Sequence, residues 1–251
     1  WYRHTGRRSI VLEPRGTTYR IADEPVKGAI CILAASLMFA LLGAFVRAAS
    51  AMLPNEMVVF FRNALVLVFL MPLFAARRSL PAMSGGKMHL HVLRASAGLV
   101  SMYCYFYALA HMKLAEAVLL SYTSPLFIPI IAFLWLHEPL NRRIRIAVLI
   151  GFAGVLLILK PGLSIFQPVA LVALSAALFA SLAMVTIRRM SDTERPESIV
   201  FFFTLLSTVI SAVPLTWAWQ VPGREALVIL VFLGLAAMAG QLLMTKGYGL
   251  A

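Results

Sequence analysis

The chain has 251 residues, of which 61% are hydrophobic and only 13% are charged. A soluble domain is about half apolar and a quarter charged, so this composition excludes an ordinary water-soluble fold. The net charge of +12 does not indicate a nucleic-acid-binding surface, because the basic residues stand in short clusters between apolar stretches, as in a membrane protein that sets its orientation.

Residues 1–26 form a polar segment that precedes the first apolar stretch. The segment carries five arginines and contains no apolar core, so it is not a cleavable signal peptide. We expect it to be a basic cytoplasmic tail. Its arginines are Arg3, Arg7, Arg8, Arg15 and Arg20.

Eight apolar stretches follow, each about as long as the roughly 17–25 residues that a transmembrane helix needs. Transmembrane strands would show alternating segments of about ten residues, so we predict helices. Two cysteines, Cys31 and Cys104, lie inside these stretches and indicate neither a disulfide framework nor a metal site. The predicted spans are 28–46, 57–76, 92–110, 114–136, 144–160, 168–187, 198–218 and 226–245.

Lysine and arginine are distributed unevenly between the two sides that these spans define. With the N-terminus inside, 17 of them fall in inside segments and four in outside segments, and Arg62 is left within a span. Basic loops stay on the cytoplasmic side, so we expect a multi-pass protein of a bacterial-type inner membrane with a cytoplasmic N-terminus. The outside residues are Arg47, Lys113, Lys160 and Arg224.

An internal repeat relates the two halves of the chain at offsets of 136 to 142 residues. Gly98 in span three aligns with Gly234 in span eight. The remaining matches pair Ser-Leu-Met-Phe-Ala (36–40), Val-Phe-Phe (59–61) and Pro-Leu (72–73) with Ala-Ala-Leu-Phe-Ala (176–180), Val-Phe-Phe (200–202) and Pro-Leu (214–215).

Each repeat unit is expected to hold five helices, an odd number, so the second unit enters the membrane from the opposite side. We assign 27–162 to the first unit and 163–251 to an incomplete second unit with three of its five helices. Ala251 aligns with Ala115, at the start of span four. We therefore expect ten spans in the intact protein, with about fifty residues lacking here.

Inverted repeats of this kind recur in secondary transporters, whose substrate site lies near the midplane between the repeats. The alternatives are a channel or a non-transporting scaffold, and no span shows the ring of like residues that a channel needs. An enzyme is not expected: no Gly-x-Ser-x-Gly elbow, phosphate-binding loop or intramembrane His cluster occurs, and both aspartates lie in inside segments. We expect no cofactor and no metal.

Several motifs resemble the EamA domain of the drug/metabolite transporter superfamily. They are Leu-Ala-Glu-Ala (114–117), Ser-Pro-Leu-Phe (124–127), Glu-Pro-Leu (138–140), Gly-Phe-Ala-Gly-Val-Leu-Leu-Ile (151–158), Phe-Arg (61–62) and Tyr-Phe-Tyr-Ala-Leu (105–109). The resemblance implies a ten-helix carrier of two five-helix repeats. It also implies export or exchange of amino acids, nucleotide-like metabolites or drugs by alternating access.

Two ionisable residues are candidates for the substrate site, because charges inside a bilayer are costly. Arg62 lies about five residues into span two, and Glu116 lies at the start of span four, both counted from the outer side. One hypothesis pairs them. The alternative is that Arg62 snorkels to the outer interface while Glu116 is solvated there.

Further candidates are polar or helix-bending residues of spans three, four and eight. Prolines in span four predict a bend that either borders a polar cavity or is only a kink packed with hydroxyl groups. A buried amide in span eight needs a partner, which favours a place in the cavity wall. These candidates are Tyr103, Tyr107, Ser121, Tyr122, Thr123, Ser124, Pro125 and Gln241.

Small residues form stripes in span one (Ser36, Ala40, Ala44) and in span eight (Ala236, Gly240). Such stripes let helices approach closely. They predict a tight contact either between the two repeats or between two copies of the chain in a homodimer.

Overall fold

The computed structural model describes residues 25–76, 88–137, 139–159, 168–191 and 196–250; the predicted tail lies almost wholly outside them. These residues form ten helices and no strand, which confirms an all-α fold over the described part of the chain. The helices are α1 (Pro25–Ser50), α2 (Asn55–Ala76), α3 (Met88–His111), α4 (Leu114–Ser121), α5 (Ser124–Leu136), α6 (Arg142–Leu159), α7 (Pro168–Ser191), α8 (Pro196–Ala212), α9 (Leu215–Ala218) and α10 (Arg224–Leu250).

Helices lie at all eight positions that the apolar stretches predict. Among the described residues, six segments are long and apolar enough to cross a membrane: Val26–Ser50, Asn55–Pro72, Met88–His111, Leu114–Leu136, Pro168–Met190 and Arg224–Met244. The stretches at α6 and α8 are shorter or more charged, so the count of eight stays a prediction.

The surface of the bundle is apolar. Leu33 on α1 and Leu149 and Leu157 on α6 are 73%, 70% and 77% exposed, respectively. Soluble proteins rarely leave large contiguous apolar patches open to water. Together with the long apolar helices, these surfaces define a multi-pass membrane protein.

Two of the predicted spans are broken, each beside a proline. Span four divides into α4 and α5 at Tyr122 and Thr123, with Pro125 in the first turn of α5. Span seven divides into α8 and α9, with Pro214 just before α9. A proline lacks the backbone N–H, and its ring clashes with the carbonyl four residues earlier, so it favours a break or a kink. The α2 and α5 helices nevertheless continue through Pro72 and Pro129.

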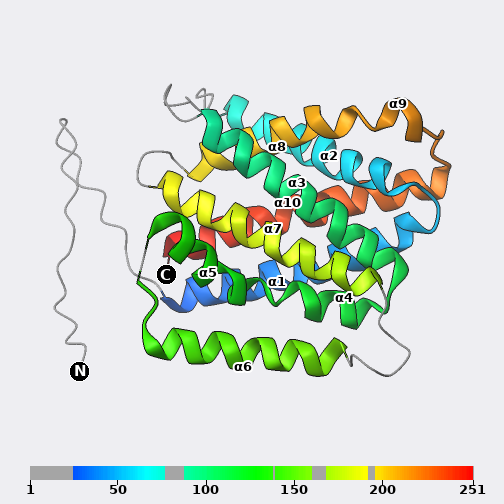
Figure 1. The fold of residues 1–251 in the computed structure, drawn as a ribbon. Coiled ribbons are helices and arrows are strands. Elements are labelled where there is room, and N and C mark those ends of the chain that lie inside the picture. Colours follow the sequence, from blue (N-terminus) through cyan, green and yellow to red (C-terminus); the bar gives the residue numbers. More distant parts are fainter. Residues whose placement is uncertain (1–24, 77–87, 138, 160–167, 192–195, 251) are drawn as a thin grey trace, which may run out of the picture.

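The helices run side by side with roughly parallel axes, and their contacts pair the two halves of the chain (Figure 1). The α1 helix packs along α10, and α3 packs along α7. The α2 helix contacts both α8 and α10, while α3 contacts α8. The α6 helix lies at the edge of the bundle, where its main neighbour is α5 (Figure 1).

Small residues set the closest approaches between these helices. A Cβ atom on Gly240 would lie 3.0 Å from the Phe39 ring, so the span-eight stripe packs against α1 within one chain. The span-one stripe is different, because Ser36, Ala40 and Ala44 are exposed. Only one of the two predicted stripes is therefore used inside the described chain.

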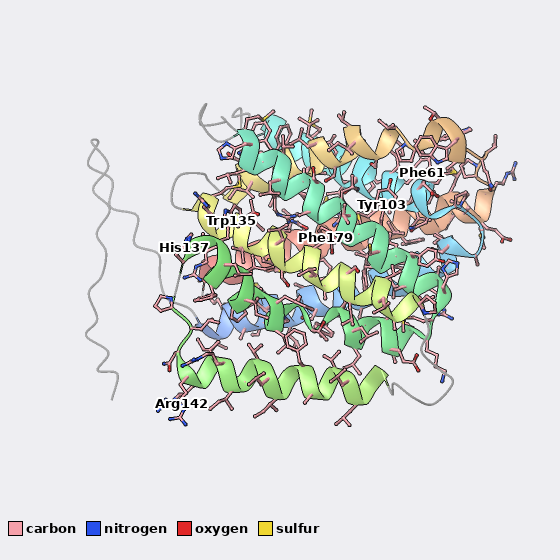
Figure 2. The ribbon with its side chains drawn as sticks, viewed as in Figure 1. Phe61, Tyr103, Trp135, His137, Arg142 and Phe179 are labelled. Atoms are coloured by element: carbon pink, nitrogen blue, oxygen red, sulfur yellow. The ribbon has the colours of Figure 1, made fainter. Side chains whose placement is uncertain are left out.

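An apolar cluster closes one end of the bundle. Leu90, Met190 and Ile199 are buried together, and Trp135 packs against them. The Arg189 guanidinium lies 5.1 Å from the centre of the Trp135 ring. Trp135 and the basic residue Arg142 lie at this same end in Figure 2. It is the end that the charge distribution assigns to the inside.

Arg47 joins α1 to the end of α3 at the opposite side of the bundle. Its Nη1 donates hydrogen bonds to the carbonyls of Leu109 (3.0 Å) and Met112 (2.6 Å). The Leu109 carbonyl lies in the last turn of α3 and Met112 directly follows the helix, so both carbonyls lie at the negative end of the helix dipole, where helical donors are lacking.

Replacing Arg47 with alanine should lower the free energy of unfolding by about 1–2 kcal/mol, because two charge-assisted hydrogen bonds are lost at a partly solvated site. Thermal unfolding in detergent measures the effect. The matched control is Arg224→Ala, which removes an exposed positive charge at the start of α10. That control should be neutral, and equal destabilisation by both variants would contradict a specific role for Arg47.

Candidate functional site

Arg62 lies in the interior of the bundle on α2. Its side chain is only 6% exposed, and Nη1 donates a 2.9 Å hydrogen bond to Oδ1 of Asn63. Asn63 is fully buried and donates in turn to the carbonyl of Val59 at 3.0 Å. The Nε atom of Arg62 is buried without a hydrogen-bond partner among the described residues. Arg62 does not snorkel to the surface.

A second arginine, Arg94, enters the bundle from α3. Its guanidinium carbon lies 4.1 Å from the centre of the Phe203 ring on α8, in cation–π geometry. The guanidinium also lies against Gly98, one turn further along α3. Its Nε is buried without a hydrogen-bond partner in the described part of the chain. Counting charges by segment assigned Arg94 to the inside, but α3 begins at Met88 and carries Arg94 almost two turns into the helix.

The predicted pair of Arg62 and Glu116 does not form. Glu116 lies in the first turn of α4 and forms an ion pair with Lys113 at 3.6 Å. Their side chains are 46% and 85% exposed, respectively, so this pair is solvated and contributes little. The alternative reading of Glu116 as an interfacial residue is therefore the correct one.

The glutamates in the described helices are Glu56, Glu116, Glu197 and Glu225. Glu56, Glu116 and Glu225 lie in the first turns of α2, α4 and α10, at the end of the bundle opposite the start of α6 (Figure 1). Glu197 is the second residue of α8, and its side chain lies outside the described set. No ion pair joins Arg62 or Arg94 to any described carboxylate. The site therefore carries positive charge that the described protein does not neutralise.

Tyr103 lies within the bundle, and Tyr107 lies toward the surface. The Tyr103 hydroxyl is buried without a hydrogen-bond partner among the described residues, while its carbonyl accepts a 3.0 Å bond from Nδ2 of Asn55. Tyr107 is 38% exposed and stacks on His111 with ring centres 4.0 Å apart. Tyr107 thus fits an interfacial belt, as its position near the helix end suggested.

The predicted bend in span four is present, and its hydroxyl groups satisfy the local backbone. Ser121 Oγ donates to the Val118 carbonyl at 2.8 Å, and Thr123 Oγ1 donates to the Leu120 carbonyl at 2.6 Å. Tyr122, between the two helices, is 68% exposed. The Ser121 and Thr123 hydroxyl groups around the kink are therefore already hydrogen-bonded. This favours a kink packed with hydroxyl groups over a bend that borders a polar cavity.

Ser181 on α7 supplies the contact that completes the bend. Its Oγ lies 2.8 Å from the Ser124 carbonyl and 2.7 Å from the Ala177 carbonyl. Pro125, the next residue of α5, is exposed. A neighbouring helix thus satisfies a carbonyl beside the break, as membrane helices with prolines require. The sequence carried no signal that singled out Ser181.

Replacing Ser181 with alanine should lower the free energy of unfolding by about 1 kcal/mol, because a buried carbonyl loses its hydroxyl donor. The control is Ser175→Ala, whose hydroxyl bonds the Leu171 carbonyl of its own helix near the surface. Thermal unfolding of the two variants should separate by about 2–4 °C. Coincident unfolding curves would show that the bend does not depend on Ser181.

Further polar residues lie on α8 and α10. Gln241 is partly buried on α10 and has an interaction partner. On α8, Thr204, Thr208 and Ser211 each donate to a carbonyl three or four residues earlier. Ser207, fully buried on the same helix, has no hydrogen-bond partner among the described residues.

Long apolar helices that surround the buried Arg62 and the partly buried Arg94 define a polytopic membrane protein with a cationic interior, an arrangement suited to moving polar solutes. Residues 26–160 match the EamA-like transporter family. The chain belongs to this family. It is 33% identical over 233 residues to the pseudopaline exporter CntI of Pseudomonas aeruginosa strain UCBPP-PA14, a match that covers 91% of this chain and 80% of the exporter.

Other relatives are also transporters. The riboflavin transporter of Vibrio cholerae is 27% identical, with 92% of this chain and 79% of that protein covered. A crystal structure of a protein with 21% identity superposes with a TM-score of 0.61, covering 88% of this chain and 79% of that one. At that identity the structural match concerns the fold alone.

Proposed function

We propose that this protein is a secondary transporter that moves a small metabolite or drug, amino-acid-like or nucleotide-like, across the inner membrane by alternating access. One observation carries the proposal: two arginines lie within the helix bundle, Arg62 on α2, which is buried, and Arg94 on α3, which is partly buried against Phe203 of α8. Charges within a membrane protein are costly and mark substrate or ion pathways.

We propose further that the alternating elements are two inverted repeats, 27–162 and 163–251. If α7, α8 and α10 correspond to α1, α2 and α3, the contact of α1 with α10 corresponds to that of α7 with α3. The contact of α2 with α10 likewise corresponds to that of α8 with α3. Both arginines then lie where the two repeats meet, which is where such carriers bind substrate.

The proposed orientation places the N-terminus in the cytoplasm. Arg142, Arg143 and Arg145 begin α6, and Arg188 and Arg189 end α7, all at the end of the bundle where α1 begins (Figure 1). Fewer basic residues lie at the opposite end, where the described ones are Arg47, Lys113 and Arg224. This asymmetry supports the orientation, because basic residues accumulate on the cytoplasmic side.

Transport by membrane vesicles of known orientation tests the proposal. Uptake of pseudopaline, riboflavin, amino acids, nucleotides and drugs is measured in inverted vesicles with and without a proton gradient, against vesicles that lack the protein. Saturable movement of one compound is expected. A stably folded protein that moves none of them would favour a scaffold, and non-saturable flux would favour a channel.

A further inference from the structure

We propose that the transported compound is an anion, and that Arg62 and Arg94 bind its carboxylate or phosphate oxygens. The inference rests on the proposed transport function and names the chemical class of its substrate. It depends on what the interior of the bundle offers to a ligand and on what it lacks.

The first argument concerns hydrogen-bond donors. Buried side-chain atoms without a hydrogen-bond partner among the described residues include four donors: the Nε atoms of Arg62 and Arg94 and the hydroxyls of Tyr103 and Ser207. Two further such atoms, Ser50 Oγ and the acceptor Asn55 Oδ1, lie where α1 ends and α2 begins. Arginine has donors and no acceptor. Buried donors without acceptors are rare in folded proteins. An oxyanion supplies several acceptor lone pairs at once.

The second argument concerns charge. Among the described residues, Arg62 donates its one hydrogen bond to the neutral amide of Asn63, and Arg94 contacts the neutral ring of Phe203. Two like charges held in one low-dielectric interior repel each other. A guanidinium presents a planar fork of donors that matches carboxylate and phosphate oxygens. Binding an anion would therefore offset both repulsion and desolvation.

The third argument concerns position. Arg62 is the eighth residue of α2, and Arg94 is the seventh residue of α3, which runs in the opposite direction. At about 1.5 Å of rise per residue, each lies roughly 10 Å from its own helix start, so Arg62 is nearer the outer end and Arg94 nearer the inner end. Ser207 lies one turn beyond Phe203 on the same face of α8. The donors thus extend along the middle of the bundle.

Solvent does not reach the Nε atoms of Arg62 and Arg94 or the hydroxyls of Tyr103 and Ser207, although the Arg94 side chain as a whole is partly exposed. An anion can reach them only after helices separate at one end, which is the motion that alternating access requires. Since Arg94 is nearer the inner end, an outward-moving anion would meet Arg94 before Arg62.

Ligand-dependent stabilisation of the purified full chain tests the proposal without a known substrate. The midpoint of thermal unfolding is measured in detergent at fixed ionic strength, with glutarate against the neutral glutaramide and with glycerol 3-phosphate against glycerol. A saturable rise of roughly 5 °C at a hundredfold excess over Kd is expected for at least one anion and for neither neutral analogue. The two anions distinguish a carboxylate substrate from a phosphate substrate.

Variants connect this stabilisation to the two arginines. Arg62→Gln and Arg94→Gln should each weaken binding of the stabilising anion at least tenfold, and Arg62→Lys should weaken it less. The exposed residue Arg145 provides the matched control, and Arg145→Gln should bind as the parent does. Elution as a single species shows that each variant is folded. Loss of binding in Arg145→Gln as well would overturn the assignment.

Other results also decide the matter. Equal stabilisation by the neutral analogues, no stabilisation by either anion, or undiminished binding in the folded double variant Arg62→Gln/Arg94→Gln would each overturn the anion site. Stabilisation by an anion without any transport would support the anion site and overturn the proposed transport function. Saturable transport of an uncharged compound without stabilisation by an anion would support the transport function and overturn the anion site.

Discussion

Replacing Arg62 with glutamine is expected to reduce transport at least tenfold at subsaturating substrate. The glutamine keeps a polar, buried side chain but loses the positive charge and the forked donor group. Hydrogen bonds to charged groups contribute about 1.5–3 kcal/mol, which corresponds to roughly ten- to a hundredfold in affinity. Initial rates in proteoliposomes, measured over a range of substrate concentrations, give the KM and the maximal rate of each variant.

The conservative variant Arg62→Lys separates charge from geometry. It keeps the charge but cannot form two parallel hydrogen bonds to one oxyanion, so an intermediate rate is expected. Arg145→Gln, on the exposed face of α6, should transport as the parent does. If Arg62→Gln were stably folded and fully active, Arg62 would have no part in the substrate site.

Much of the fold follows from apolar segment length, because a helix must be long enough to cross the bilayer with its backbone bonded internally. This rule placed helices correctly at all eight apolar stretches, including the short ones. The break near Pro125 was also predictable, since the chemistry of proline acts locally. The break before Pro214 has the same cause, but it was not predicted, because Pro214 was considered only as part of the repeat match.

The site was harder to predict, because side-chain partners depend on neighbouring helices. Arg62 and Glu116 were paired on depth alone, but Lys113 lies one turn from Glu116 on the surface and takes that partner. Arg94 was counted with a loop although it fell two residues inside the predicted span 92–110. A charge just inside a span boundary is ambiguous by sequence, and only the packing against Phe203 places it in the interior.

The repeat alignment also relates two residues of the site, Arg62 and Phe203. Matching Val-Phe-Phe at 59–61 with 200–202 brings Arg62 into register with Phe203. The position that carries a guanidinium in α2 therefore carries, in α8, the aromatic ring that contacts the other guanidinium. The two proposed repeats therefore contribute different groups to the site. The first repeat contributes Arg62 and Arg94, and the second contributes the Phe203 ring that contacts Arg94.

Replacing Gly234 with alanine is expected to destabilise the protein by about 1–3 kcal/mol, which lowers the unfolding midpoint by several degrees. A Cβ atom at this position on α10 would lie 2.7 Å from the Cβ of Leu65 on α2. The Leu65 Cβ is attached directly to the backbone, so the two helices must move apart. Gly154 on α6 is the control, because a Cβ there meets nothing within 4 Å. Gly154→Ala should be neutral or stabilising, since alanine favours a helix over glycine by up to about 1 kcal/mol.

Gly98→Ala should differ from Gly234→Ala although the two glycines align in the proposed repeats. Its Cβ would lie 2.7 Å from Cε2 of Phe203 and would also meet the Arg94 guanidinium, both at the far ends of side chains that can rotate. The loss of stability should therefore be smaller than for Gly234→Ala. Transport should fall more strongly, because Arg94 is displaced from its ring. A fully active Gly98→Ala variant would show that Arg94 is not part of the proposed site. Equal destabilisation by Gly98→Ala and Gly234→Ala would show that the Phe203 side chain cannot rotate away from the added methyl group.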